Sequence, residues 1–158
     1  MLINKKEKSM PSETDLIKLY SGKILKMAAE PIYRERLSEP DASVTKRSPL
    51  CGSAITVDLN VKSGIITNYG QDVRACALGQ ATSTIIGKAI VGRSLTEVQR
   101  AYEELSDMLK NEGPTPGKPF EELYMLKPAS EYKNRHASIL LALEATLAAF
   151  QQIEENDS

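Results

Sequence analysis

Hydrophobic positions change their spacing twice along the chain, and the changes separate a helix, a group of strands and a second group of helices. Up to Pro31, apolar residues recur every three or four positions, which is typical of a helix with one buried face. Between residues 42 and 69 apolar and polar residues alternate, as on a half-buried strand. Beyond Cys76 the helical spacing returns and continues to Phe150. The pattern therefore predicts strands flanked by helices.

The strand region contains one long alternating run and two shorter candidates. Ser63 and Gly64 are turn residues that can join two antiparallel strands, so we expect strands at 55–62 and 65–69. Residues 42–47 can supply a third strand. The apolar positions of the long run are Ile55, Val57, Leu59 and Val61.

Capping and stop signals mark the later helices. A capping box at Ser94–Glu97 opens a helix that ends at Gly113–Pro114. A short helix is expected at 120–126 before a break at Pro128, and a last helix begins between residues 130 and 134. Helices that follow a run of strands predict an α+β domain, with a three-stranded antiparallel sheet and helices packed on one of its faces. The apolar stripe of the last helix is Leu140, Leu143, Leu147 and Phe150.

Length and composition suit one domain without a nucleic-acid or membrane partner. The 158 residues can enclose one hydrophobic core, and we expect a disordered segment at 1–11, a single domain at 12–153 and a flexible tail at 154–158. A net charge of -1 gives no electrostatic reason for binding nucleic acid or anionic lipid. No apolar run approaches the roughly 20 residues of a spanning helix, and no signal-peptide core follows Met1. We therefore expect a cytoplasmic protein.

Three residues carry the chemistry that the sequence offers. Cys51 lies between Pro49 and Gly52 in a turn before a strand, where a side chain can point outward. Cys76 opens a helix, where unpaired peptide N–H groups and the helix dipole favour a thiolate. His136 lies in the first turn of the last helix, in line with the apolar stripe, so it faces the fold. The same dipole favours the neutral imidazole that a metal ligand requires.

Each of these residues can instead be an ordinary packed side chain, as buried free cysteines often are. The two cysteines cannot form the disulfide framework of a small secreted protein, and they are too far apart for a Cys-x-x-Cys site. The sequence has no phosphate-binding loop, dinucleotide fingerprint or nucleophile elbow. A site of thiols and imidazole and a packed interior both stay open.

The order of these residues and elements resembles one family of proteins. The segments that carry the resemblance are Ser48-Pro49-Leu50-Cys51-Gly52, Ala75-Cys76-Ala77-Leu78 and Arg135-His136-Ala137-Ser138. Together with the hairpin, they are similar to the NifU N-terminal, IscU and SufU scaffolds of iron-sulfur cluster assembly, over the length from Leu16 to Phe150. The resemblance implies that Cys51 and Cys76 match the first two cysteine ligands, and that His136 matches the histidine beside the third.

Two positions depart from the family pattern. Ser53 stands in place of the family aspartate, and Ala137 stands in place of the third cysteine, unless a shift of one residue puts His136 there. Either alignment leaves Cys51, Cys76 and His136 as the metal and cofactor ligands. Two thiolates and an imidazole suit zinc or ferrous iron with a fourth position open. A transient iron-sulfur cluster needs a further ligand from outside this set.

The resemblance implies a carrier rather than an enzyme. A cysteine desulfurase would pass persulfide sulfur to Cys51 or Cys76, and the chain would hold iron or a transient iron-sulfur cluster for apo iron-sulfur proteins. One alternative is a SufU-like zinc-dependent sulfur acceptor, which is closer to a sulfurtransferase, and another is a degenerate interaction domain without chemistry. The chain lacks the Leu-Pro-Pro-Val-Lys segment that Hsc chaperones read in IscU-type relatives, so we expect no such dependence. We expect a monomer or weak oligomer.

Overall fold

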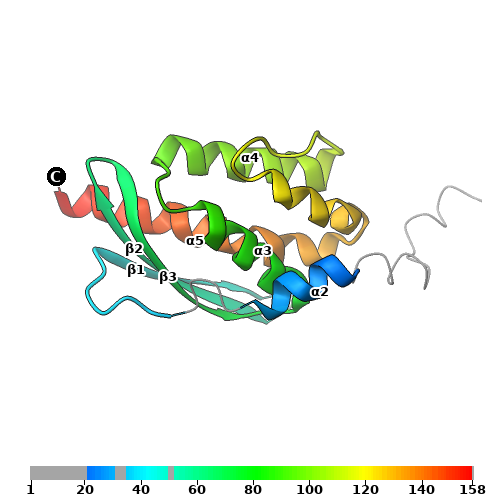
Figure 1. Cartoon of the computed structure of the whole chain (residues 1–158), viewed down its shortest axis with the longest axis horizontal. Helices are drawn as coiled ribbons and strands as arrows, with labels where there is room; N and C mark the ends of the chain where they lie inside the picture. The colour runs from blue at the N-terminus through cyan, green and yellow to red at the C-terminus, as the bar shows by residue number, and fades with distance from the viewer. Residues whose placement is uncertain (1–20, 31–34, 50–51, 158) are drawn as a thin grey trace, which may run out of the picture.

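The computed structural model describes residues 21–30, 35–49 and 52–157, and in them the elements follow the predicted order (Figure 1). They form three layers: the sheet, then α3 and α5, then α4 with the 3-10 helix η2. α2 packs against α3. The elements are α2 (Gly22–Ala29), β1 (Ala42–Ser48), β2 (Ser53–Lys62), β3 (Ile65–Arg74), α3 (Ala77–Ala89), α4 (Leu95–Asn111), η2 (Glu121–Glu131) and α5 (Lys133–Asp157).

The three strands form an antiparallel sheet in the order β1-β2-β3, as predicted. The hairpin between β2 and β3 turns at Ser63 and Gly64, whose φ angles of 53° and 79° suit the tight turns that match strand twist. β3 continues past the predicted end at Tyr69 and reaches Arg74, which pairs with Ala54 of β2. The end of β1, the start of β2 and the end of β3 therefore lie at the same edge of the sheet, and α3 begins there.

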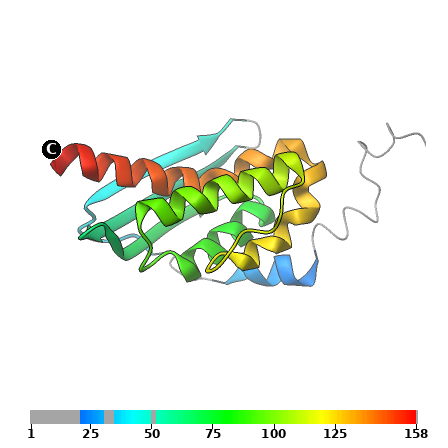
Figure 2. The same cartoon turned by 90° about the horizontal axis from the view of Figure 1, so that it is seen from above.

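One face of the sheet carries the hydrophobic core. Ile55, Val57 and Leu59 of β2 have no exposed surface on this face. α5 packs on β1 and β2, and α3 packs on β3 and on α5. Figure 2 shows α5 running along the strands with α4 beside it. The predicted α+β arrangement, with helices on one face of the sheet, is confirmed.

The other face of the sheet is anchored by a buried carboxylate. Asp58 of β2 accepts hydrogen bonds from the Arg36 side chain, the Leu37 N–H and the Ser43 hydroxyl. Gly70 of β3 pairs with Asp58, and a Cβ at Gly70 would lie 2.5 Å from the carbonyl oxygen of Glu35. Glycine is therefore required where residues 35–37 cross the sheet.

A close contact between α3 and α5 fixes the helices relative to each other near the end of the sheet. A Cβ at Gly79 would lie 2.7 Å from the Ser138 hydroxyl oxygen. Deeper in the core, the Gln71 side chain donates to the Ser83 carbonyl at 3.1 Å and so links β3 to α3. The contact at Gly79 holds the first turns of α3 and α5 side by side.

Two boundaries differ from the sequence-based expectations. α5 begins at Lys133, as predicted, but it is helical as far as Asp157, which includes most of the expected tail at 154–158. The expected break at Pro128 is wrong, because Pro128 lies inside η2. A 3-10 helix is a series of short turns, so a missing proline N–H removes only one of its bonds. Residues 12–20 of the first expected helix lie outside the described residues. Among the described helices, none is long and apolar enough to cross a membrane.

Candidate thiol and metal site

Cys76 is the N-cap residue of α3, as the sequence predicts. Its backbone is extended, with φ −65° and ψ 171°, and its side chain makes no capping hydrogen bond. The side chain is partly exposed. The first-turn N–H groups of a helix have no partner within the helix, so this end of α3 can accept an anion beside the sulfur.

Ser138 of α5 connects Cys76 to β2. Its hydroxyl oxygen lies 3.7 Å from the sulfur of Cys76 and 3.0 Å from the hydroxyl oxygen of Ser53. Both serines are buried, with 1% and 2% of their surface exposed. The structure therefore brings Cys76 together with Ser53 through Ser138, a residue to which the sequence pattern assigns no chemical role. The glycine at position 79 is a sequence signal for a close helix contact, and Ser138 is the residue that makes this contact.

Cys51 lies outside the described residues, but the ends of its loop are defined. Ser48 and Ser53 are paired at the ends of β1 and β2. Gly52 has a φ of 69°, and its N–H donates to the Ser48 carbonyl at 2.9 Å. The described residues on either side of Cys51, Ser48 and Gly52, therefore lie at the end of the sheet where Ser53 contacts Ser138.

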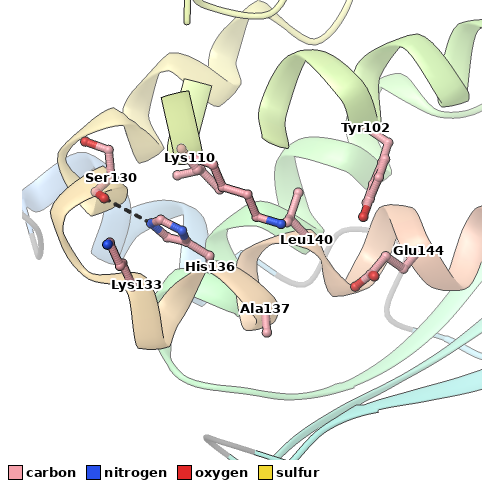
Figure 3. A pocket seen from close by; sticks show the side chains of 9 residues that line it. Tyr102, Lys110, Ser130, Lys133, His136, Ala137, Leu140 and Glu144 are labelled. Carbon is pink, nitrogen blue, oxygen red and sulfur yellow. Dashed lines mark hydrogen bonds between the residues drawn. The ribbon is translucent and has the colours of Figure 1, made fainter. Parts of the chain in front are cut away.

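His136 is buried, as predicted, but its partners are backbone carbonyls. Its Nε2 lies 3.0 Å from the Ala129 oxygen. It also lies 3.2 Å from the Ser130 oxygen, the contact drawn in Figure 3. Two carbonyl acceptors at this distance indicate that Nε2 carries a proton and donates it, so Nδ1 is the ring nitrogen without a carbonyl partner among the described residues. His136 and Ser138 are two positions apart on a helix and so face roughly opposite sides of α5. Nothing in the described part of the chain shows a contact between His136 and Cys76.

The structure leaves the predicted three-ligand set untested. Within residues 21–30, 35–49 and 52–157, no three side chains of histidine, cysteine, aspartate or glutamate lie close enough to hold a metal ion together. Cys51 is outside these ranges, so a set that includes it is not addressed. Cys51, Cys76 and His136 stay a prediction as metal and cofactor ligands.

A cavity of about 510 Å³ opens beside His136, between α4 and α5. Figure 3 shows the side chains of Tyr102 and Glu144 directed toward each other at one end and His136 directed toward Ser130 at the other. Ala137, which follows His136 in the sequence, is part of the wall. The cavity is lined by Tyr102, Leu109, Lys110, Ser130, Lys133, His136, Ala137, Leu140 and Glu144.

The charged groups of this cavity influence one another. Burial raises the pKa of Glu144 above its ordinary value, while the charges of Lys46 and Lys110 and a hydrogen bond from Tyr102 oppose the rise. Burial also raises the pKa of Tyr102, and the carboxylate of Glu144 adds to this shift. The cavity itself is lined by the carboxyl group of Glu144 and by two lysines, Lys110 and Lys133.

Comparisons with known proteins agree with this arrangement. Residues 19–139 match the family model of the NifU-like N terminal domain. The chain is 24% identical over 135 residues to the iron-sulfur cluster assembly scaffold protein IscU of Thermotoga maritima, covering 85% of this chain and 94% of that protein.

Solved structures show the same fold. The N-terminal part of a nitrogen-fixing NifU-like protein from Brucella abortus is 38% identical, with a TM-score of 0.87 over 89% of this chain and 98% of that one. A protein from Fervidobacterium islandicum, described as a scaffold for the SUF system, is 15% identical, with a TM-score of 0.77 over 85% and 98% of the two chains. The family match and the Brucella relative lead to one conclusion: this chain belongs to the NifU-like N-terminal domain family.

Proposed function

We propose that this chain is a carrier in iron-sulfur cluster assembly, which accepts sulfur from a cysteine desulfurase and holds iron or a transient cluster for apo-proteins. One observation carries the proposal: in a fold of this family, Cys76 is partly exposed at the N-terminal end of α3 and is linked through Ser138 to Ser53, two positions after Cys51 in the sequence. The relative from Thermotoga maritima is named as such a scaffold. Iron and sulfide are the cargo of the protein in this role.

Cys51 and Cys76 are the thiolate ligands of the proposed site. Covalent geometry keeps the Cα of Cys51 within about 7 Å of the Cα of Ser53. Ser53 is joined through Ser138 to Cys76. Two thiolates are the ligands that a soft metal ion prefers.

His136 is the proposed third ligand, through Nδ1. Its Nε2 hydrogen bond to Ala129 is the kind of outer contact that orients metal-bound histidines. The ring lies against the cavity between α4 and α5, and among the described residues its hydrogen bonds go to backbone carbonyls and not to Cys76. His136 must therefore be tested separately from the cysteines.

Sulfur transfer needs no group beyond the thiols. A thiolate of Cys76 or Cys51 would attack the terminal sulfur of the persulfide on the desulfurase. A new S–S bond forms on this chain, the S–S bond of the desulfurase breaks, and the desulfurase cysteine leaves as a thiolate. The Ser138 hydroxyl lies 3.7 Å from the Cys76 sulfur and can donate a hydrogen bond to it during this exchange.

A second candidate is a zinc-dependent sulfur acceptor. Two thiolates and an imidazole form a common donor set for zinc with one open position. A third candidate is an interaction domain without metal chemistry. The buried hydroxyl pair of Ser53 and Ser138 favours it, because Ser53 is uncharged at the position where the resemblance implies an aspartate. The three candidates differ in the metal that the purified protein retains.

Metal analysis of anaerobically purified protein separates the candidates. The carrier predicts iron with acid-labile sulfide, the acceptor predicts stoichiometric zinc without sulfide, and the interaction domain predicts neither. The chain has two cysteines, so the double variant Cys51→Ser/Cys76→Ser is a complete thiol blank. Full metal retention in a His136→Ala variant would remove His136 from the ligand set.

Persulfide formation tests the sulfur-accepting step. Incubation with a cysteine desulfurase and cysteine should add the mass of one sulfur atom to a peptide that contains Cys51 or Cys76. The matched control is the same reaction with the double serine variant. Unmodified peptides in the wild-type protein would contradict this step.

A further inference from the structure

The cavity between α4 and α5 holds opposite charges that do not pair with each other. Lys110 of α4 and Glu144 of α5 both line it. The charge of Lys110 acts on the carboxyl group of Glu144, yet the two side chains are not among the ion pairs of the described residues. Figure 3 shows Lys110 extending in the direction of the end where Glu144 and Tyr102 lie. A ligand that carries both charges can fill the space between the lysine and the carboxyl group.

The opposite end of the cavity attracts a second anionic group. Lys133 and Ser130 line this end, and within the described ranges Lys133 also forms no ion pair. α5 begins at Lys133, so the unpaired N–H groups of its first turn and the positive end of its dipole lie here as well. Leu140 lies between Lys133 and Glu144 on the cavity side of α5. The lining therefore runs from a cationic end, past an apolar wall, to a carboxyl group.

We propose that this cavity binds a free acidic α-amino acid, such as glutamate. The α-carboxylate would lie against Lys110 and the ammonium group against Glu144, so that the zwitterion bridges these two charges. The side-chain carboxylate would extend toward Lys133 and the Ser130 hydroxyl, with its methylene groups against Leu140. The binding is noncovalent, uses neither cysteine and does not depend on the proposed function.

The lining favours this class of ligand over simpler ones. A dicarboxylate without an amine would gain from the lysines but would be repelled by Glu144. A purely apolar ligand would desolvate the charged groups without compensation. The volume of about 510 Å³ lies within the usual range of small-molecule sites, and an amino acid has room there.

The first experiment measures binding to the full chain by calorimetry and removes one ligand group at a time. L-glutamate is the probe. Glutarate lacks the ammonium group, γ-aminobutyrate lacks the α-carboxylate, and glutamine has a neutral side chain. Each should bind about tenfold or more weakly than glutamate, because each loses one charge-assisted contact. Absence of binding at millimolar glutamate, or glutarate binding as tightly as glutamate, would overturn the proposal.

The second experiment assigns each ligand group to a side chain. Glutamate should lose its advantage over glutarate in Glu144→Gln, over γ-aminobutyrate in Lys110→Met, and over glutamine in Lys133→Met. The two lysines are exposed and Glu144 is partly exposed, so these substitutions leave the core intact. An undiminished advantage of glutamate over glutarate in Glu144→Gln would overturn the proposal.

Matched controls separate the cavity from the general charge of the protein and from the proposed function. Lys62→Met and Glu103→Gln make the same substitutions at exposed positions outside the cavity lining, and both should bind glutamate as the wild type does. A tenfold loss in Lys62→Met would contradict binding in the cavity. The Cys51→Ser/Cys76→Ser variant should also bind glutamate normally, whether or not the wild type binds metal or accepts sulfur. Loss of glutamate binding in that variant would contradict a site built from α4 and α5.

Discussion

Replacing Asp58 by alanine should destabilise the protein, because it removes the hydrogen bonds that hold residues 35–37 on the face of the sheet opposite the helices. The carboxylate accepts bonds from Arg36 Nε at 2.7 Å, Arg36 Nη2 at 3.1 Å, Leu37 N–H at 2.9 Å and Ser43 Oγ at 2.6 Å. A hydrogen bond to a charged group contributes about 1.5–3 kcal/mol, but the Arg36 side chain is 50% exposed and water replaces much of its contribution. We therefore expect a loss of about 2–3 kcal/mol in the free energy of unfolding.

Urea denaturation at 25 °C measures this loss, and an unchanged m-value would show that the unfolded state is not altered. The matched control is Asp72→Ala on β3, whose carboxylate is 50% exposed and lies 3.9 Å from an exposed Arg74, so its effect should stay below about 0.5 kcal/mol. An Asp58→Ala variant as stable as this control would refute the anchoring role.

The loss of stability in Asp58→Ala should also depend on pH. Burial tends to raise the pKa of Asp58, but the hydrogen bonds from Arg36, Ser43 and Leu37 outweigh it and hold this pKa below its ordinary value. The folded protein then binds fewer protons than the unfolded chain at acidic pH, so this contribution is complete above the unfolded pKa of about 4 and is lost as the pH falls through the folded pKa. The stability gap between wild type and Asp58→Ala should narrow below about pH 4, and a constant gap would contradict this assignment.

Three further changes test the packing and the charges of the fold. Gly79→Ala should cost about 1–3 kcal/mol in urea denaturation, because the added Cβ would lie 2.7 Å from the Ser138 hydroxyl; a neutral effect would mean that α3 and α5 are not in tight contact. Ser94→Ala removes one half of a complete capping box and should cost about 0.5–2 kcal/mol, with Thr96→Ala as the exposed control in the same turn. Glu144→Gln should raise the free energy of unfolding at pH 7, because a raised pKa means that folding disfavours the charged carboxylate. That gain should disappear below about pH 4, and a gain that persists there would have another cause.

The alternation of β2 and the spacing of the later helices were sufficient to predict the fold. β3 was predicted too short because Gly70 and the buried Gln71 interrupt its alternation. Gly70 is explained by the backbone of residues 35–37, which crosses it, and Gln71 by its bond to Ser83. Both are contacts between segments far apart in sequence, which local periodicity does not describe.

For the candidate site, the sequence predicted the positions of single residues but not the contacts between them. The position of Cys76 at a helix start and the burial of His136 follow from local spacing, and both are confirmed. The contact between Cys76 and Ser138 depends on how α3 and α5 are rotated about their axes, and the sequence pattern does not define this rotation. For the same reason the sequence did not show that the imidazole of His136 bonds the Ala129 carbonyl.

The most direct test of the carrier role is anaerobic reconstitution of the purified chain with ferrous iron, a cysteine desulfurase, cysteine and a dithiol reductant, which reduces the persulfide sulfur to sulfide. The account predicts that the wild-type protein binds iron and sulfide together and absorbs in the visible and near-ultraviolet ranges, as thiolate-bound iron does. The Cys51→Ser/Cys76→Ser variant, carried through the same procedure, should bind neither. Equal iron and sulfide on the two proteins, or none on the wild type, would contradict a cluster site built on Cys51 and Cys76.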